Sequence, residues 1–191
     1  MKWLTPNMIT ASRLFLAPVV LLMLCYWQTA VGFFLTAALM GLIELTDHLD
    51  GRLARGTNQV SEMGKLFDPL CDCLYHQIVF LGFLSFGWVP LWAVVIIVIR
   101  EIIVAYARIF AGLRRVVLAA RITGKIKAAT QGTAQITLVV AYSLAALGLP
   151  LPVKEIGSAL LAIAALVTLV SLADYLWHVY FEISKLPASA K

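Results

Sequence analysis

Between residues 47 and 72 the chain reads Asp47-His48-Leu49-Asp50-Gly51-Arg52-Leu53-Ala54-Arg55, and after eight further residues Gly64, Asp68 and Asp72 follow at intervals of four. Four aspartates thus fall within 26 residues, although charged residues make up only 13% of the chain. Apolar runs flank this stretch at residues 30–45 and 74–86. A carboxylate at the end of a membrane helix is energetically costly, so four of them together indicate a functional site.

The spacing of these aspartates predicts two helical faces. Asp47 and Asp50 are three residues apart, whereas Gly64, Asp68 and Asp72 are four apart, so each set follows one side of a helix. A helical hairpin would bring the two sides together, and four unpaired carboxylates would then repel one another. Divalent cations relieve such repulsion, and a set of oxygen donors favours Mg²⁺ or Mn²⁺ over zinc.

Small residues accompany the aspartates. Gly51, Ala54 and Gly64 have little or no side chain, so a ligand could lie close to the backbone at these positions. The alternative interpretation is that the four acids are solvated in a loop, with Arg52 and Lys65 among their basic neighbours.

The composition predicts an integral membrane protein. The 191 residues are 62% hydrophobic, and their mean hydropathy is +0.93, which exceeds what a soluble domain of this size needs. We expect a single domain over residues 1–191 with an all-α fold, consisting of a short N-terminal interfacial helix and six transmembrane helices of ~20 residues. The expected spans are residues 7–26, 30–46, 67–86, 91–110, 128–147 and 155–177, with a short helix outside the membrane within 51–65.

The distribution of basic residues predicts the orientation. With these six spans, Lys154 falls on one side of the membrane, and the other side carries Arg52, Arg55, Lys65, Arg108, Arg114, Arg115, Arg121, Lys125, Lys127 and Lys185. By the positive-inside rule, the aspartates and both termini face the cytoplasm, which places the protein in the inner (plasma) membrane. We expect interfacial aromatic belts of Trp27, Trp88 and Trp92 outside, and of Trp3, Tyr175 and Trp177 inside. The net charge of +5 therefore reflects topology and a substrate pocket, and nucleic acid is a poor candidate partner.

The pattern Asp-x2-Asp-Gly-x2-Ala-Arg-x8-Gly-x3-Asp-x3-Asp resembles the motif of the CDP-alcohol phosphotransferases, and every fixed position is present. The resemblance implies a phosphatidyltransferase that uses CDP-diacylglycerol and acts as a homodimer. It also implies that Asp47, Asp50, Asp68 and Asp72 bind two Mg²⁺ or Mn²⁺ ions that bridge the pyrophosphate. Asp72 would be the general base on the acceptor hydroxyl.

The same resemblance implies a nucleotide site, made by Asn7, Thr10, Asp47, Gly51, Ala54, Arg55 and Gly64. From the residues alone, Asn7 and Thr10 could equally be interfacial capping groups at the start of the first span. Within the family, Pro6-Asn7-x2-Thr10-x2-Arg13, Arg100-Glu101-Ile102 and residues 124–131 are similar to bacterial phosphatidylglycerophosphate synthases, which use glycerol-3-phosphate as acceptor. Cys73 stands where those synthases usually have lysine, and His48 where they have an apolar or aromatic residue.

The basic stretch at residues 114–127 has three possible roles: it could hold topology, bind anionic lipid headgroups, or bind a substrate phosphate. Lys125 and Lys127 are expected to straddle the start of the fifth helix, where free backbone N–H groups also favour an anion. With Arg108 they are the predicted acceptor phosphate site.

Three further points stay open at the level of sequence. Arg100 and Glu101 lie in the middle of the fourth span and either brace the helices or reach the site. Asp174 and His178 are i,i+4 neighbours and are most simply a local hydrogen-bonded pair. The alternative functions are the same chemistry with inositol phosphate, serine or phosphatidylglycerol as acceptor, or an ion-coupled transporter that uses intramembrane acids.

Overall fold

The computed structural model describes residues 6–53, 62–114 and 121–185, with side chains described at 13–46, 70–114 and 121–185. Within these ranges every regular element is a helix: α1 Pro6–Tyr26, α2 Ala30–Leu53, α3 Glu62–Ser85, α4 Leu91–Leu113, α5 Ile122–Ala146 and α6 Val153–Ser184. The prediction of an all-α fold built from six long helices is therefore confirmed for the described part of the chain.

Several helices extend beyond the predicted spans. α2 continues past residue 46 to Leu53, α3 begins at Glu62 rather than 67, and α5 begins at Ile122 rather than 128. The prediction counted apolar residues, but backbone hydrogen bonds continue a helix through polar residues as well. The prediction of a separate short helix within 51–65 is therefore wrong at both ends of that range, which belong to α2 and α3. Residues 54–61 lie outside the described residues.

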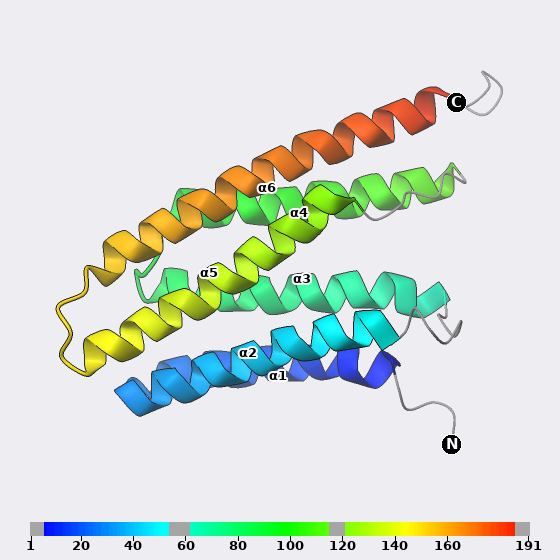
Figure 1. The fold of residues 1–191 in the computed structure, drawn as a ribbon. Helices are drawn as coiled ribbons and strands as arrows, with labels where there is room; N and C mark the ends of the chain where they lie inside the picture. The colour runs from blue at the N-terminus through cyan, green and yellow to red at the C-terminus, as the bar shows by residue number, and fades with distance from the viewer. Residues whose placement is uncertain (1–5, 54–61, 115–120, 186–191) are drawn as a thin grey trace.

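Successive helices run in opposite directions along a common axis (Figure 1). As a result, the last turns of α2, α4 and α6 lie at the same end of the molecule as the first turns of α1, α3 and α5. α1 packs against α2 and α3, α2 packs against α5, and α4 and α5 both pack against α6. The polar groups of α1, α2, α3 and α5 are thereby brought together at one end of the bundle.

Two glycines end helices at the opposite end of the bundle. Gly87 (φ 67°) and Gly148 (φ 94°) adopt left-handed backbone conformations just beyond α3 and α5. The N–H of Gly87 donates to the carbonyl of Leu84, and the N–H of Trp88 donates to that of Phe83, which is the Schellman arrangement. The same pair of bonds recurs after α5, so both sharp reversals depend on a residue without a Cβ.

The hydrophobic core contains an aromatic cluster around Trp88. This side chain stacks on Tyr142 with ring centroids 3.7 Å apart and on Phe83 at 5.5 Å, and the residue is only 8% exposed. The prediction that Trp88 belongs to an interfacial belt is therefore wrong, because its ring fills the space between α3 and α5. Tyr175 is likewise buried, whereas Trp27, Trp92 and Trp177 are more than half exposed.

By length and composition, one helix of the described chain, α6 (Val153–Ser184), is apolar enough to cross a membrane. Shorter apolar segments occur in α1, α2 and α3 at Arg13–Tyr26, Ala30–Thr46 and Leu70–Ser85. α4 is a continuous helix, but its apolar sequence is interrupted by three charged residues, Arg100, Glu101 and Arg108. Six membrane crossings therefore stay a prediction.

Candidate active site

The aspartates of the motif lie on two helices at one end of the bundle. Asp47 and Asp50 are in the last two turns of α2, and Asp68 and Asp72 are in the first three turns of α3. Figure 1 shows these helix ends at the same end of the molecule. The predicted placement on two helices is therefore confirmed, while the side chains of Asp47, Asp50 and Asp68 lie outside the described residues and their convergence stays a prediction.

The predicted nucleotide site is described only at the level of the backbone. Gly51 is on α2, Gly64 is on α3, and Asn7 and Thr10 are on the first turns of α1. Ala54 and Arg55 lie outside the described residues. The nucleotide-binding roles of all these positions stay predictions.

Asp72 is the one motif aspartate whose side chain is described, and it is held from two helices. Its Oδ1 lies 3.6 Å from Nη1 of Arg13 on α1 and 3.5 Å from Nε2 of His76, one turn further along α3. Arg13 and His76 are buried, whereas the Asp72 side chain is 32% exposed. The carboxylate is therefore fixed by buried groups on one side and remains accessible on the other.

His76 is held in place by α5. Its Nδ1 lies 2.8 Å from Oε1 of Gln135, and Nε2 of Gln135 donates to the backbone carbonyl of His76 at 2.9 Å. Nε2 of the ring also lies 3.5 Å from Oε1 of Glu44 on α2. Buried polar groups need such partners, since an unsatisfied donor or acceptor costs about 1–3 kcal/mol.

Glu44 reaches the ring across a close contact with α5. A Cβ at Gly132 would lie 2.7 Å from Oε1 of Glu44, so the carboxylate occupies the space that a side chain would take. Gly132 itself is buried. The lack of a side chain at residue 132 thus allows a carboxylate from α2 to lie against α5.

A second charged cluster joins α4, α5 and α6. Nζ of Lys127 lies 2.6 Å from Oε1 of Glu101, and Nη1 of Arg100 donates to both oxygens of Glu101 at 3.1 Å. Nη2 of Arg100 also donates to Ser171 on α6 at 2.9 Å. The Arg100–Glu101 pair therefore braces three helices.

Of the predicted acceptor phosphate residues, Lys127 is buried in this cluster, while Arg108 and Lys125 are exposed. The expectation that Lys125 and Lys127 straddle the start of a helix is wrong. α5 begins at Ile122, and the N–H of Lys125 already donates to the carbonyl of Arg121. The free N–H groups of the first turn therefore precede both lysines, and any role in anion binding rests on the side chains alone.

The expected pairing of Asp174 with His178 is also wrong. Asp174 instead accepts two hydrogen bonds from Arg121, at 2.6 and 2.5 Å, and one from Thr123 at 2.6 Å. The two-pronged guanidinium matches the carboxylate better than an imidazole does. This contact ties the start of α5 to α6.

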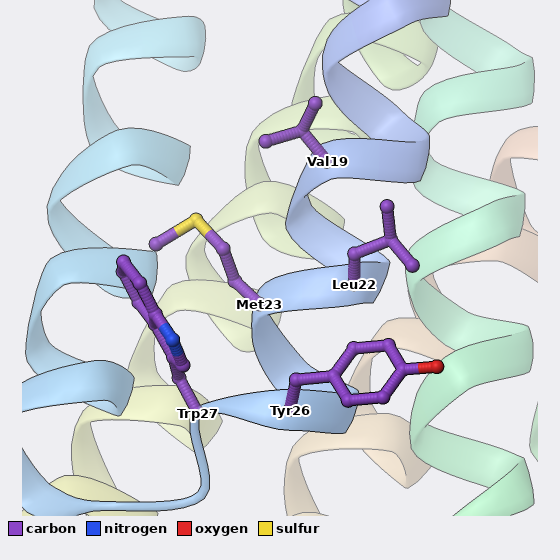
Figure 2. Close-up of a pocket in the computed structure, with 5 residues that line it drawn as sticks. All are labelled: Val19, Leu22, Met23, Tyr26 and Trp27. Atoms are coloured by element: carbon purple, nitrogen blue, oxygen red, sulfur yellow. The ribbon is translucent and has the colours of Figure 1, made fainter.

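An apolar hollow lies further along α1, about two to four turns beyond Arg13. It is lined by Val19, Leu22, Met23, Tyr26 and Trp27, and Figure 2 shows the hydroxyl of Tyr26 directed away from Trp27. The hollow has no charged group and lies towards the end of α1 opposite the aspartates. It therefore plays no part in the polar site.

Sequence reasoning missed the residues around Asp72. His76 continues the four-residue spacing of Gly64, Asp68 and Asp72, so the spacing itself could have included it. Glu44 and Gln135 gave no such signal, because the spacing of residues within one helix does not show which other helices it contacts.

The residues present fit divalent cations by the chemistry of their donors. The four motif acids offer only oxygen donors, and the one whose side chain is described, Asp72, keeps about a third of that side chain exposed. Carboxylates with an accessible face are the usual ligands of Mg²⁺ and Mn²⁺. Among the side chains that the structure describes, no group of three or more acids, histidines or cysteines is arranged to hold a metal ion.

The sequence pattern of the family described as CDP-alcohol phosphatidyltransferase matches residues 3–170. The match covers the motif on α2 and α3 and ends near the middle of α6. The chain belongs to this family of phosphatidyl-transferring enzymes. The resemblance predicted from the aspartate motif is therefore confirmed.

Curated relatives extend over most of the chain. A probable phosphatidylglycerophosphate synthase of Mycobacterium tuberculosis is 32% identical over 171 residues, which cover 88% of this chain and 78% of that protein. A CDP-diacylglycerol–glycerol-3-phosphate 3-phosphatidyltransferase of Rickettsia typhi is 30% identical over 170 residues, 89% of this chain and 93% of that protein. A CMP-forming cardiolipin synthase of Streptomyces coelicolor is 39% identical over only 62 residues, 32% of this chain and 29% of that protein.

Proposed function

We propose that this enzyme transfers the phosphatidyl group of CDP-diacylglycerol to a hydroxyl of glycerol-3-phosphate, giving phosphatidylglycerophosphate and CMP. The observation that carries this proposal is the similarity to relatives named for this reaction over nearly the whole chain. The match to a cardiolipin synthase covers less than a third of either protein, so phosphatidylglycerol is the weaker acceptor candidate. Membership of a transferase family argues against the ion-coupled transporter.

The substrate would approach from the bilayer. We infer that the diacylglycerol tails remain in lipid while the CDP group reaches the ends of α2 and α3. The nucleotide would lie against Gly51, Ala54, Arg55 and Gly64, where little side-chain volume separates a ligand from the backbone. Asp47, Asn7 and Thr10 complete the proposed nucleotide site.

Two Mg²⁺ or Mn²⁺ ions are proposed to bind Asp47, Asp50, Asp68 and Asp72. When bound, they would neutralise the charge of the pyrophosphate and of the departing CMP. The chain's own part is to hold the carboxylates in place, and Asp72 is held by Arg13 and His76.

Asp72 is proposed to accept the proton of the acceptor hydroxyl. The acceptor oxygen then bonds to the phosphatidyl phosphorus as the bond from that phosphorus to CMP breaks. Asp72 suits this role because its side chain is accessible on one side, and a general base must lie within hydrogen-bond reach of the hydroxyl. Protein residues form no covalent intermediate in this scheme.

The first test is an assay of the purified protein with CDP-diacylglycerol and a panel of acceptors. We expect CMP release with glycerol-3-phosphate, loss of turnover on addition of EDTA, and recovery with Mg²⁺ or Mn²⁺. Preference for inositol phosphate, serine or phosphatidylglycerol would overturn the acceptor assignment. Full activity in metal-free buffer would contradict the two-metal proposal.

We further propose six membrane crossings with both termini and the aspartates on the cytoplasmic side. The alternating direction of the helices supports this arrangement (Figure 1), as does the excess of basic residues at one end. A homodimer is proposed from the family resemblance.

This topology is testable by labelling single cysteines in a background without Cys25, Cys71 and Cys73. Lys125→Cys should react with an impermeant maleimide only in inverted vesicles, because Lys125 is exposed and lies near the start of α5. Lys154→Cys, at the start of α6, should react only from the outside of intact cells. The reverse pattern would contradict both the span count and the cytoplasmic location of the site.

A further inference from the structure

We propose that His76 is a positioning residue, which fixes the Asp72 carboxylate for cation binding and is itself fixed by Gln135. The proposal rests on the proposed function in so far as Asp72 is a cation ligand there. His76 was not among the residues predicted for the site. It is nevertheless the buried side chain that connects Asp72 to α2 and α5.

The orientation of the Gln135 amide follows from its two contacts. A backbone carbonyl only accepts hydrogen bonds, so the group 2.9 Å from the carbonyl of His76 must be the amide nitrogen of Gln135. The amide oxygen therefore faces the ring, 2.8 Å from Nδ1. Since an amide oxygen only accepts, Nδ1 of His76 is the donor in that contact.

The other ring nitrogen then faces carboxylates. Nε2 lies 3.5 Å from Oδ1 of Asp72 and 3.5 Å from Oε1 of Glu44. Both ring nitrogens thus face acceptors: Nδ1 faces Gln135, and Nε2 faces Asp72 and Glu44. A side chain at residue 132 of α5 would collide with the Glu44 carboxylate, because its Oε1 lies 2.7 Å from the position of a Cβ there.

The position of the contact on Asp72 suits a supporting role. The distances from Asp72 to Arg13 and to His76, 3.6 and 3.5 Å, are both measured at its Oδ1. His76 is 2% exposed and so does not itself reach substrate. Partners of this kind orient a metal ligand, and removing them typically weakens metal binding about 10–100-fold.

Two substitutions at His76 test the contributions of the two ring nitrogens separately. An asparagine amide can replace Nδ1 and keep the contact with Gln135, but it is too short to replace Nε2. A glutamine amide can replace Nε2 and keep a donor towards Asp72. A role in packing alone would make His76→Asn and His76→Gln similar, whereas positioning of Asp72 would make them different.

The experiment measures Mn²⁺ binding to purified protein without substrate, from the loss of the free Mn²⁺ signal in electron paramagnetic resonance. We expect His76→Asn to weaken binding about 10–100-fold and His76→Gln to stay within a few-fold of the wild type. In the CDP-diacylglycerol assay, His76→Asn should lower kcat more than it raises either KM.

The matched control is Ser143→Ala. Ser143 is also buried on α5, two turns beyond Gln135, and its hydroxyl donates to the carbonyl of Ala30 at 2.7 Å. This variant loses a buried interhelical hydrogen bond away from Asp72, so Mn²⁺ binding should not change.

The outcomes separate this proposal from the proposed function. Wild-type protein that binds Mn²⁺ while His76→Asn and His76→Gln both bind it equally well would overturn the positioning role alone. Equal weakening by both variants and by Ser143→Ala would also overturn it, because loss of packing would then explain the effect. Wild-type protein that binds no Mn²⁺ would overturn the metal site and the positioning role together.

Discussion

Replacing Asp50 or Asp68 with asparagine should lower CMP release from CDP-diacylglycerol by roughly 10²–10⁴-fold with every acceptor tested. Metal ions contribute several kcal/mol of charge stabilisation in such reactions, and about 1.4 kcal/mol corresponds to a factor of ten in rate. Asparagine keeps the size and shape of the side chain but removes the negative charge. The loss should therefore come from the cations rather than from misfolding.

The loss should be independent of the acceptor because the charge being neutralised is that of the pyrophosphate, which all acceptors share. Release of CMP is the measurement, followed by chromatography with each alcohol in turn. A suitable control is Glu182→Gln near the end of α6, where the carboxylate contacts Lys185 at 2.8 Å. Glu182→Gln should retain full activity. Full activity of Asp68→Asn would contradict the proposed metal site.

The six long helices could be predicted from the sequence, but their ends could not. Six apolar runs separated by turn residues were sufficient to place the helices, and Gly87 and Gly148 mark two ends correctly because only glycine adopts those backbone angles easily. The starts of α3 and α5 were missed, since hydropathy does not register polar residues that continue a helix. The first turns of α5 carry Lys125 and Lys127.

The aspartate motif could be found because its spacing is local. The surroundings of Asp72 could not, because they depend on which helices are neighbours. α1 packs against α3 and α2 against α5, and helices that are apolar on most sides give little indication of which face meets which partner. Glu44 and Gln135 therefore reach the site from α2 and α5 without any signal in their own segments. Arg13 on α1 does belong to a sequence pattern, but that pattern did not indicate its contact with Asp72.

The wrong predictions for Asp174 and Trp88 have the same cause. Asp174 was paired with its neighbour on the same helix, although Arg121 at the N-cap of α5 binds it through two nitrogens. Trp88 was placed at the membrane interface because it lies in a turn, although Tyr142 on α5 covers its ring. In both residues a long-range contact takes precedence over the local pattern.

Lys127→Ala should raise the KM for glycerol-3-phosphate by roughly 10–150-fold while the KM for CDP-diacylglycerol changes little. The range corresponds to the loss of one charge-assisted contact of about 1.5–3 kcal/mol to the acceptor phosphate. If that contact is equally strong in the ground and transition states, kcat should change less than KM.

The cluster around Glu101 makes Lys127 the best supported of the three residues proposed to bind the acceptor phosphate. Arg100 and Lys127 share the carboxylate of Glu101, so among the ion-pair contacts of the described side chains two cations face one anion here. Such a surplus of positive charge would attract a phosphorylated acceptor. In Lys127→Ala, Glu101 keeps its contacts with Arg100, and no unpaired carboxylate is left behind. Lys127→Arg should largely preserve the KM because it keeps the charge.

A purely structural role for Lys127 predicts a different pattern. Both KM values would then stay unchanged, and the thermal midpoint of unfolding would fall together with kcat, because the contact between α4 and α5 is lost. Arg108→Ala and Lys125→Ala, which remove the other two predicted acceptor cations, both of them exposed, complete the comparison. If all three alanine variants leave the kinetics with glycerol-3-phosphate unchanged, the acceptor is not recognised through these cations. The basic residues would then serve only to hold the proposed topology, in which lysine and arginine are in excess on the cytoplasmic side.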